Sequence, residues 1–159
     1  MEVYRAKNLN FTYAGAETPA LQHIDFSVNE GDFVLLFGAS GSGKTTLLRL
    51  LKQEIAPAGH LSGELTYLGT SVRDVPYKTS VAEIGYTAQN PDTQQVSEFV
   101  CNELRFLLEN LGVSEAEINL RVAETVTFFG TEDLYSRRIS TLSGGEKQIV
   151  NLQAVFVSN

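Results

Sequence analysis

Residues 33–51 combine, in this order, an apolar run, a glycine-rich loop and a leucine-rich segment. The apolar run, residues 33–37, predicts a strand that is buried on both faces, as in a parallel sheet. Residues 38–45 match the pattern G-x-x-x-x-G-K-[ST], and leucines then recur at helical spacing over residues 47–51. A strand, this loop and a helix in succession are the context of a phosphate-binding loop.

The residue types in this loop suit the binding of a nucleotide. Glycines allow the backbone to curl so that its N–H groups point at phosphate oxygens, and the following helix directs its positive end at the same anion. Lys44 can reach the β- and γ-phosphates, and the Thr45 hydroxyl can ligate Mg²⁺. The alternative is a glycine-rich turn with a solvated lysine, which the flanking strand and helix disfavour. We predict phosphate binding by Gly38, Ala39, Ser40, Gly41, Ser42, Gly43, Lys44, Thr45 and Thr46.

Composition narrows the class of protein. The length of 159 residues suits one domain, and the net charge of −7 argues against a nucleic-acid surface, because phosphate backbones are held by Lys and Arg. Cys101 is the single cysteine, so no disulfide within the chain is possible and a reducing cytosol is the simplest location. No apolar run approaches the roughly 18 residues needed to span a bilayer. A role at a membrane would therefore need another subunit.

The remaining pattern predicts strands first and helices afterwards. Further strands are expected at residues 2–13, 24–28, 62–68 and 84–88. Apolar spacing predicts a helix over residues 96–111 that stops at Gly112, and Ser114 with Glu117 predicts a capping box for the next helix. The order is a strand-rich part, a helical insertion over about 90–142, and a final helix.

A second motif, Leu142 followed by Ser143, Gly144, Gly145 and Glu146, lies at the start of that final helix. By itself it predicts either an anion site or only a serine N-cap. The phosphate loop, a glutamine after a predicted strand and this motif about 100 residues downstream together resemble the ATP-binding cassette (ABC) transporter ATPases. The resemblance covers the whole chain.

The resemblance implies an α/β fold, a P-loop NTPase (RecA-like) core with an antiparallel β N-terminal part and an inserted α-helical subdomain. Residues 1–89 would form the nucleotide-binding core with the Walker A and Q-loop motifs, residues 90–142 the helical subdomain, and residues 143–159 the signature motif and its helix. The cofactors would be ATP and Mg²⁺. The partner would be a second ABC ATPase subunit, arranged head to tail.

Roles of single residues follow from the same resemblance. Tyr13 would stack on adenine, and the alternative is a core aromatic at a strand end. Gln89 would approach Mg²⁺ and the attacking water, and the alternative is a solvated residue in the turn before Pro91. Residues 143–145 would face the γ-phosphate bound to the partner subunit.

Two short segments, residues 89–94 and 108–112, resemble the energy-coupling factor ATPases, which drive uptake of vitamins and of cobalt or nickel ions. This implies integral membrane transport subunits as partners and a peripheral position on the cytoplasmic face of the membrane, with no nucleic acid. The transported solute belongs to the membrane partner.

The chain departs from the family in one respect. The Walker B aspartate, the catalytic glutamate and the switch histidine are expected after residue 159, and His23 and His60 precede the helical insertion. We therefore expect an N-terminal fragment that hydrolyses no ATP by itself and is poorly stable, since residues 33–37, Val155 and Phe156 would lose cover.

Three other functions compete with a transport ATPase. A small-molecule kinase needs neither the glutamine nor the Ser-Gly-Gly motif. A DNA-maintenance ATPase of the same superfamily would carry a long heptad coiled coil, and the 50 or so residues between Gln89 and Ser143 have no heptads. A nucleotide-binding module that does not hydrolyse ATP fits residues 1–159 considered by themselves.

Overall fold

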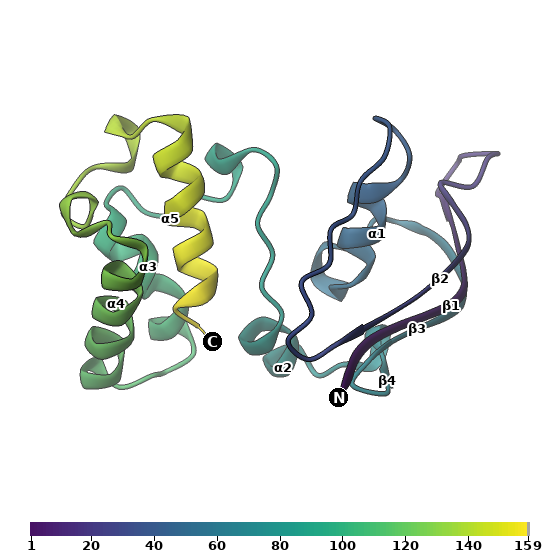
Figure 1. Cartoon of the computed structure of the whole chain (residues 1–159), viewed down its shortest axis with the longest axis horizontal. Coiled ribbons are helices and arrows are strands. Elements are labelled where there is room, and N and C mark those ends of the chain that lie inside the picture. Colours follow the sequence, from purple (N-terminus) through teal and green to yellow (C-terminus); the bar gives the residue numbers. More distant parts are fainter. Residues whose placement is uncertain (159) are drawn as a thin grey trace. The chain divides into compact units, whose positions relative to one another are not determined.

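The computed structural model describes residues 1–158, and contacts divide the chain into two compact units. The first unit is Met1–Ser80 and the second is Val81–Asn159. The first holds the β-sheet and helix α1, whereas the second is helical (Figure 1).

The first unit is built on a four-stranded antiparallel sheet of order β2-β1-β3-β4. Its strands are β1 (Glu2–Tyr13), β2 (Leu21–Asn29), β3 (Gly59–Tyr67) and β4 (Thr70–Ser71). The three long strands confirm the predictions for residues 2–13, 24–28 and 62–68, with β2 and β3 each starting three residues earlier. Side chains that alternate along β1, including Leu9 and Phe11, are buried on one face of the sheet.

Helix α1 (Lys44–Leu50) packs on this sheet, as Figure 1 shows. The hydroxyl of Tyr4 on β1 donates to the carbonyl oxygen of Leu51 at the end of α1, over 3.1 Å. The helix ends before Pro57, as predicted. Short elements that the sequence did not predict follow in the chain: the 3₁₀ turns η1 (Gln53–Ile55) and η2 (Val72–Asp74) and the helix α2 (Tyr77–Glu83).

Two predicted strands are absent from the part of the chain that the structure describes. Residues 33–37 and 84–88 form neither strand nor helix, and Phe33 and Phe37 are 94% and 84% exposed. The prediction of a strand buried on both faces at 33–37 was therefore wrong for this structure. The physical reason is that a strand needs a neighbouring strand to bond with its backbone N–H and C=O groups, which apolar composition alone cannot satisfy. Within residues 1–158, no other strand bonds to either segment.

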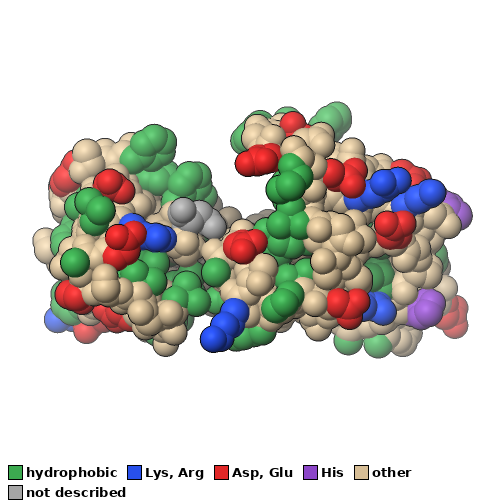
Figure 2. Space-filling view, turned by 90° about the horizontal axis from the view of Figure 1, so that it is seen from below, with side chains coloured by type: hydrophobic (Ala, Val, Ile, Leu, Met, Phe, Trp, Pro, Cys, Tyr) green, Lys and Arg blue, Asp and Glu red, His purple; other side chains and the backbone are tan. Residues whose placement is uncertain are grey.

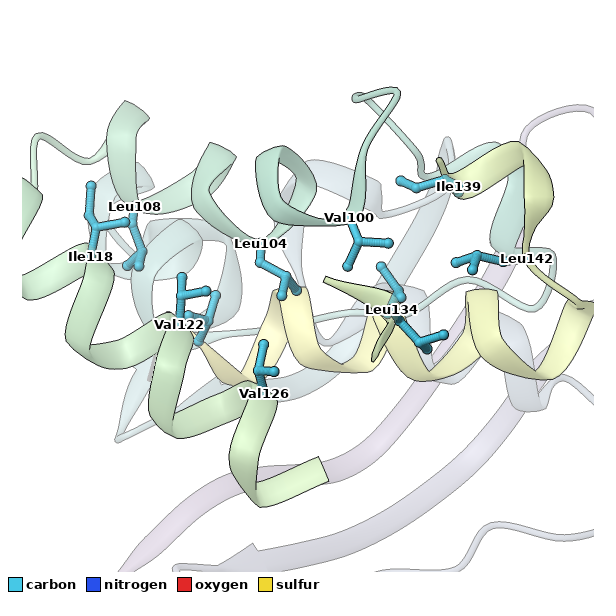
Figure 3. Close-up of a cluster of buried hydrophobic side chains, with 11 residues drawn as sticks. Val100, Leu104, Leu108, Ile118, Val122, Val126, Leu134, Ile139 and Leu142 are labelled. Carbon is cyan, nitrogen blue, oxygen red and sulfur yellow. The ribbon is translucent and has the colours of Figure 1, made fainter. Parts of the chain in front are cut away.

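The second unit consists of helices α3 (Val100–Asn110), α4 (Glu115–Phe129) and α5 (Gly144–Phe156). The 3₁₀ turn η3 (Pro91–Thr93) precedes α3, and the turns η4 (Glu132–Leu134) and η5 (Ile139–Thr141) connect α4 to α5. Apolar side chains of the three helices and their connections form one buried cluster (Figure 3). The predicted helix over 96–111 starts later than expected, and its end before Gly112 is confirmed.

Figure 3 shows how the predicted apolar faces meet: Leu104 of α3 lies opposite Val122 of α4. Both side chains are buried, as are most of their neighbours in the cluster. These apolar faces therefore form the core of the second unit. Arg105 adds a polar tie between the two helices, because its guanidinium donates to Glu109 of α3 and to Glu115 of α4.

A buried carboxylate fixes the chain just before α3. Glu103 lies on the first turn of α3, and its Oε2 accepts the backbone N–H groups of Val96 (3.1 Å) and Ser97 (2.8 Å). Burial raises the pKa of Glu103, and the hydrogen bonds from these two residues offset part of that effect. The carboxylate thus replaces the backbone partners that residues 96 and 97 lack.

The surface carries both signs of charge. On the face shown in Figure 2, Lys and Arg side chains are interspersed with Asp and Glu side chains. Within residues 1–158, no helix combines the length and apolarity required to cross a bilayer.

Replacing Glu103 tests its role as an acceptor. We expect Glu103→Ala to lower the free energy of unfolding by about 2–4 kcal/mol, because the two backbone N–H groups lose a buried acceptor at about 1–3 kcal/mol each. Glu103→Gln keeps a carbonyl oxygen at this place and should cost less than about 1 kcal/mol. Urea unfolding of the three proteins, followed by circular dichroism, measures both differences.

Because the pKa of Glu103 is raised, the difference in stability between the wild type and Glu103→Gln should depend on pH. The folded protein holds the Glu103 proton to higher pH than the unfolded chain, so the contribution of this group to stability falls as pH rises above its ordinary pKa of 4.5. Glu103→Gln has no such proton, and its stability relative to the wild type should increase over that range. A difference that is independent of pH would contradict this assignment.

Candidate functional site

The glycine-rich loop, residues 38–43, folds around its own lysine. Lys44 Nζ donates to the carbonyl oxygens of Gly38 (2.9 Å) and Ala39 (2.7 Å) and lies 3.4 Å from Ser42 Oγ. These contacts place an ammonium group at the centre of the loop. An anion that enters the loop meets a positive charge held close to the backbone.

Free backbone N–H groups lie next to Lys44 in the chain. In the part of the chain that the structure describes, the amide N–H groups of Gly43, Lys44 and Thr45 donate to no protein acceptor, since the first bond of helix α1 runs from Leu47 to Gly43. The Thr45 hydroxyl is exposed beside them. Successive free N–H groups next to a lysine can hold phosphate oxygens.

The junction of loop and helix lies against the start of β2. Gly43 has a φ of 89°, and a Cβ atom placed on it would lie 2.7 Å from both the carbonyl oxygen of Ala20 and Leu21 Cδ2. The absence of a side chain therefore allows the helix to begin directly on the sheet. This contact fixes the position of the loop relative to the strands.

Tyr13, the predicted adenine-stacking residue, lies in the same unit as the loop. Its hydroxyl is 2.7 Å from Thr46 Oγ1, and its ring meets the edge of Phe11 at a centroid distance of 5.1 Å. The side chain of Tyr13 is nevertheless 39% exposed. The structure thus places Tyr13, the loop and Lys44 in the same unit, with Tyr13 bonded to the helix that follows the loop.

Gln89 belongs to the second unit, where it lies in a bend and is exposed. The neighbouring Gln94 makes the local contacts: its side chain accepts from the N–H of Ala88 and donates to the carbonyl oxygen of Tyr86, over 3.0 Å. The segment that presents Gln89 is therefore fixed by Gln94, a role that no local sequence pattern indicated.

The second motif starts helix α5 with a complete capping box. The Ser143 hydroxyl accepts from the N–H of Glu146, and Glu146 Oε2 accepts from the N–H of Ser143 over 2.6 Å. Arg137 donates to Glu146 Oε1 (3.2 Å) and to the carbonyl oxygen of Thr141 (3.0 Å). Hydrogen bonds from Ser143 and the charge of Arg137 lower the pKa of Glu146, which keeps the carboxylate charged.

The sequence predicted a capping box at Ser114. Ser114 does cap α4 by accepting from Glu117, and the reciprocal box is formed at Ser143. The signal for Glu146 was present, because Ser143 and Glu146 also fit S-x-x-E. No local pattern indicated Arg137, which approaches from a turn before the motif.

Helix α5 is also tied to the segment after Gln89. Lys147 Nζ donates to Asp92 Oδ1 over 2.7 Å, and the side chain of Asn151 donates to the carbonyl oxygen of Pro91 over 3.1 Å. These contacts join two predicted site segments within the second unit. The phosphate loop lies in the other unit.

Comparison with known proteins identifies the class as P-loop ATP-binding domains. The family described as ABC transporter matches residues 21–159. The chain therefore belongs to the ABC transporter family. This confirms the resemblance drawn from the two sequence motifs.

Individual relatives carry the same family name. A protein of Bacillus anthracis, named as an ABC transporter ATP-binding protein, is 49% identical over 95% of this chain and 27% of its own length. A Streptomyces avermitilis protein of the same name is 35% identical over 96% of the chain and 28% of its own length. The chain thus spans about a quarter of these relatives.

Among solved structures, CbiO1 of Clostridium perfringens, part of the ABC transporter complex CbiONQ, superposes with a TM-score of 0.84. It is 28% identical, over 99% of this chain and 62% of its own chain. A nucleotide-free ATP-binding cassette from an ABC transporter gives a TM-score of 0.77 at 23% identity, over 100% of this chain and 66% of its own, and shows the same fold. The predicted α/β P-loop fold is confirmed.

A pair of glycine substitutions tests the junction of loop and helix. Gly41 and Gly43 have similar φ angles, 81° and 89°, but only a Cβ at Gly43 would meet other atoms. We expect Gly41→Ala to cost about 1–2 kcal/mol from backbone strain alone. Gly43→Ala should cost clearly more, because the helix must also move off Ala20 and Leu21. Thermal unfolding of the two variants measures the difference, and equal losses would contradict the close contact.

Proposed function

We propose that this chain is the ATP-binding part of an ABC-type ATPase that couples ATP binding and hydrolysis to solute import. One observation carries the proposal: Lys44 Nζ lies inside the glycine loop, in the same unit as the exposed ring of Tyr13. Residues 38–46 would hold the phosphates and Tyr13 would stack on the base. Residues 1–89 would act as the nucleotide-binding core.

Mg²⁺ would be held mainly by the nucleotide. Within residues 1–158, no group of three or more His, Cys, Asp or Glu side chains could hold a metal ion. Mg²⁺ commonly uses one or two protein ligands together with substrate phosphates and water, and the exposed Thr45 hydroxyl fits that role. Gln89 would supply a second oxygen. When bound, Mg²⁺ neutralises charge on the phosphate oxygens.

We propose further that Ser143, Gly144 and Gly145 serve the nucleotide bound to a second ABC ATPase subunit. The capping box and Arg137 support this, because they fix the serine and hold the start of α5 in one conformation. Residues 90–142 would form the helical subdomain and residues 143–159 the signature segment. Two such subunits, alike or different, would then enclose the nucleotides.

The membrane partner and the direction of transport are inferred from resemblance. The similarity to CbiO1, part of the CbiONQ complex, supports an importer of the energy-coupling factor type. In that arrangement the chain would lie at the cytoplasmic face of the membrane and take up a vitamin or metal ion through integral membrane subunits. The exposed surface around residues 89–94 would dock on them.

The nucleotide site is tested by removing its ammonium group. We expect Lys44→Ala to weaken ATP binding by about 100-fold or more, because at least two charge-assisted hydrogen bonds of about 1.5–3 kcal/mol each are lost. Lys78→Ala, which removes an exposed lysine of α2, is the matched control and should bind as the wild type does. Isothermal titration calorimetry measures both. Unchanged ATP affinity in Lys44→Ala would refute the site.

The signature motif is tested by blocking it with a bulky cation. Ser143→Arg should leave ATP binding by the monomer unchanged and prevent ATP-driven dimerisation, because this loop serves the opposite subunit. Ser136→Arg, at an exposed turn of the same unit, is the control. Light scattering with and without ATP reports dimerisation. Weaker monomer affinity in Ser143→Arg alone would count against the arrangement across two subunits.

A further inference from the structure

A hydrogen bond joins the aromatic residue at the end of β1 to the helix of the phosphate loop. Tyr13 Oη and Thr46 Oγ1 are 2.7 Å apart, although the two residues lie 33 positions apart in the chain. Thr46 is only 7% exposed, whereas the side chain of Tyr13 is 39% exposed. The hydroxyl of Tyr13 is therefore anchored on a buried group while part of its ring stays open.

The ring of Tyr13 is constrained at two places. Its edge-to-face contact with Phe11, at 79° between the ring planes, limits its tilt on one side. The hydrogen bond to Thr46 fixes its far end. A phenol held in this way loses little freedom when a flat ligand stacks on it, so less of the binding free energy is spent on ordering the side chain.

Thr46 is suited to link two parts of a bound nucleotide. It lies on the first turn of α1, two residues after Lys44. A hydroxyl donates one hydrogen bond and accepts two, so Thr46 can accept from Tyr13 and still donate to another group. The same side chain thus connects the stacking ring to the loop that holds phosphates.

We propose that Thr46 is a positioning residue for base recognition: its hydroxyl holds the phenol of Tyr13 and thereby sets the orientation of the ring on which the nucleotide base stacks. This rests on the proposed function, since it assumes that the loop binds a nucleotide. It assigns to Thr46 a part in recognising the base, besides any contact with phosphate.

Binding of two ligands separates base recognition from phosphate binding. ATP carries both parts, whereas inorganic tripolyphosphate carries only the phosphates. Tyr13→Phe removes the hydroxyl and keeps the ring, and Thr46→Val removes the other partner at nearly constant shape. We expect each variant to bind ATP about threefold to tenfold more weakly, as for the loss of one hydrogen bond. Tyr13→Phe should bind tripolyphosphate as the wild type does.

The double variant and a conservative variant complete the test. Tyr13→Phe with Thr46→Val should bind ATP no more weakly than Thr46→Val alone, because both changes break the same bond. Thr46→Ser keeps a hydroxyl and should restore ATP affinity. Unfolding midpoints are measured alongside, and a variant that does not fold is replaced by Thr46→Ala.

The outcomes distinguish this inference from the proposed function. Wild-type affinity for ATP in Tyr13→Phe, or losses that simply add in the double variant, would overturn the role of Thr46. Equal loss of ATP and tripolyphosphate in Tyr13→Phe would overturn it as well. A wild-type protein that binds neither ligand, or a Lys44→Ala variant that binds both, would overturn the proposed function and the inference with it.

Discussion

The close contact between Gly43 and the start of β2 is the constraint on which the candidate site depends. With a Cβ at this place only 2.7 Å from Ala20 O, any other residue would force the helix away from the sheet. The helix would then carry Lys44 and Thr46 with it. Because Thr46 bonds to Tyr13 on β1, the same contact also determines where the exposed aromatic ring lies. One glycine therefore positions the phosphate loop and the ring together.

In the helical unit, different contacts stabilise the fold and fix the positions of the helix starts. Its apolar cluster supplies burial, which is not directional, and polar contacts fix where each helix begins. Glu103 holds the chain before α3, and the Ser143 box with Arg137 holds the start of α5. Asp92 and Lys147 then join the segment after Gln89 to α5. The Ser-Gly-Gly motif is thus supported by charged residues from several turns.

Gln153 and Thr131 illustrate how little of this polar structure can be read from the sequence. Both are buried, and Gln153 Nε2 donates to Thr131 Oγ1 over 2.6 Å across 22 residues of chain. Helical spacing places Gln153 on the same face of α5 as the buried Val150 and Val157, but no local pattern indicates which residue bonds to its amide. Its partner lies in another connection, and only the packing of the helices brings the two together.

The sequence by itself determined the features that depend on neighbouring residues. The strand pattern over residues 24–28, the apolar spacing over residues 96–111, and the loop that precedes Lys44 are local patterns, and each predicted its element. The tertiary structure decided what depends on distant partners: the exposure of residues 33–37, the bond of Tyr13 to Thr46, and the approach of Arg137 to Glu146. A strand needs a neighbour for its backbone groups, and a side-chain hydrogen bond needs a second residue that the fold brings close. The spacing of nearby residues predicts neither the neighbouring strand nor the second residue.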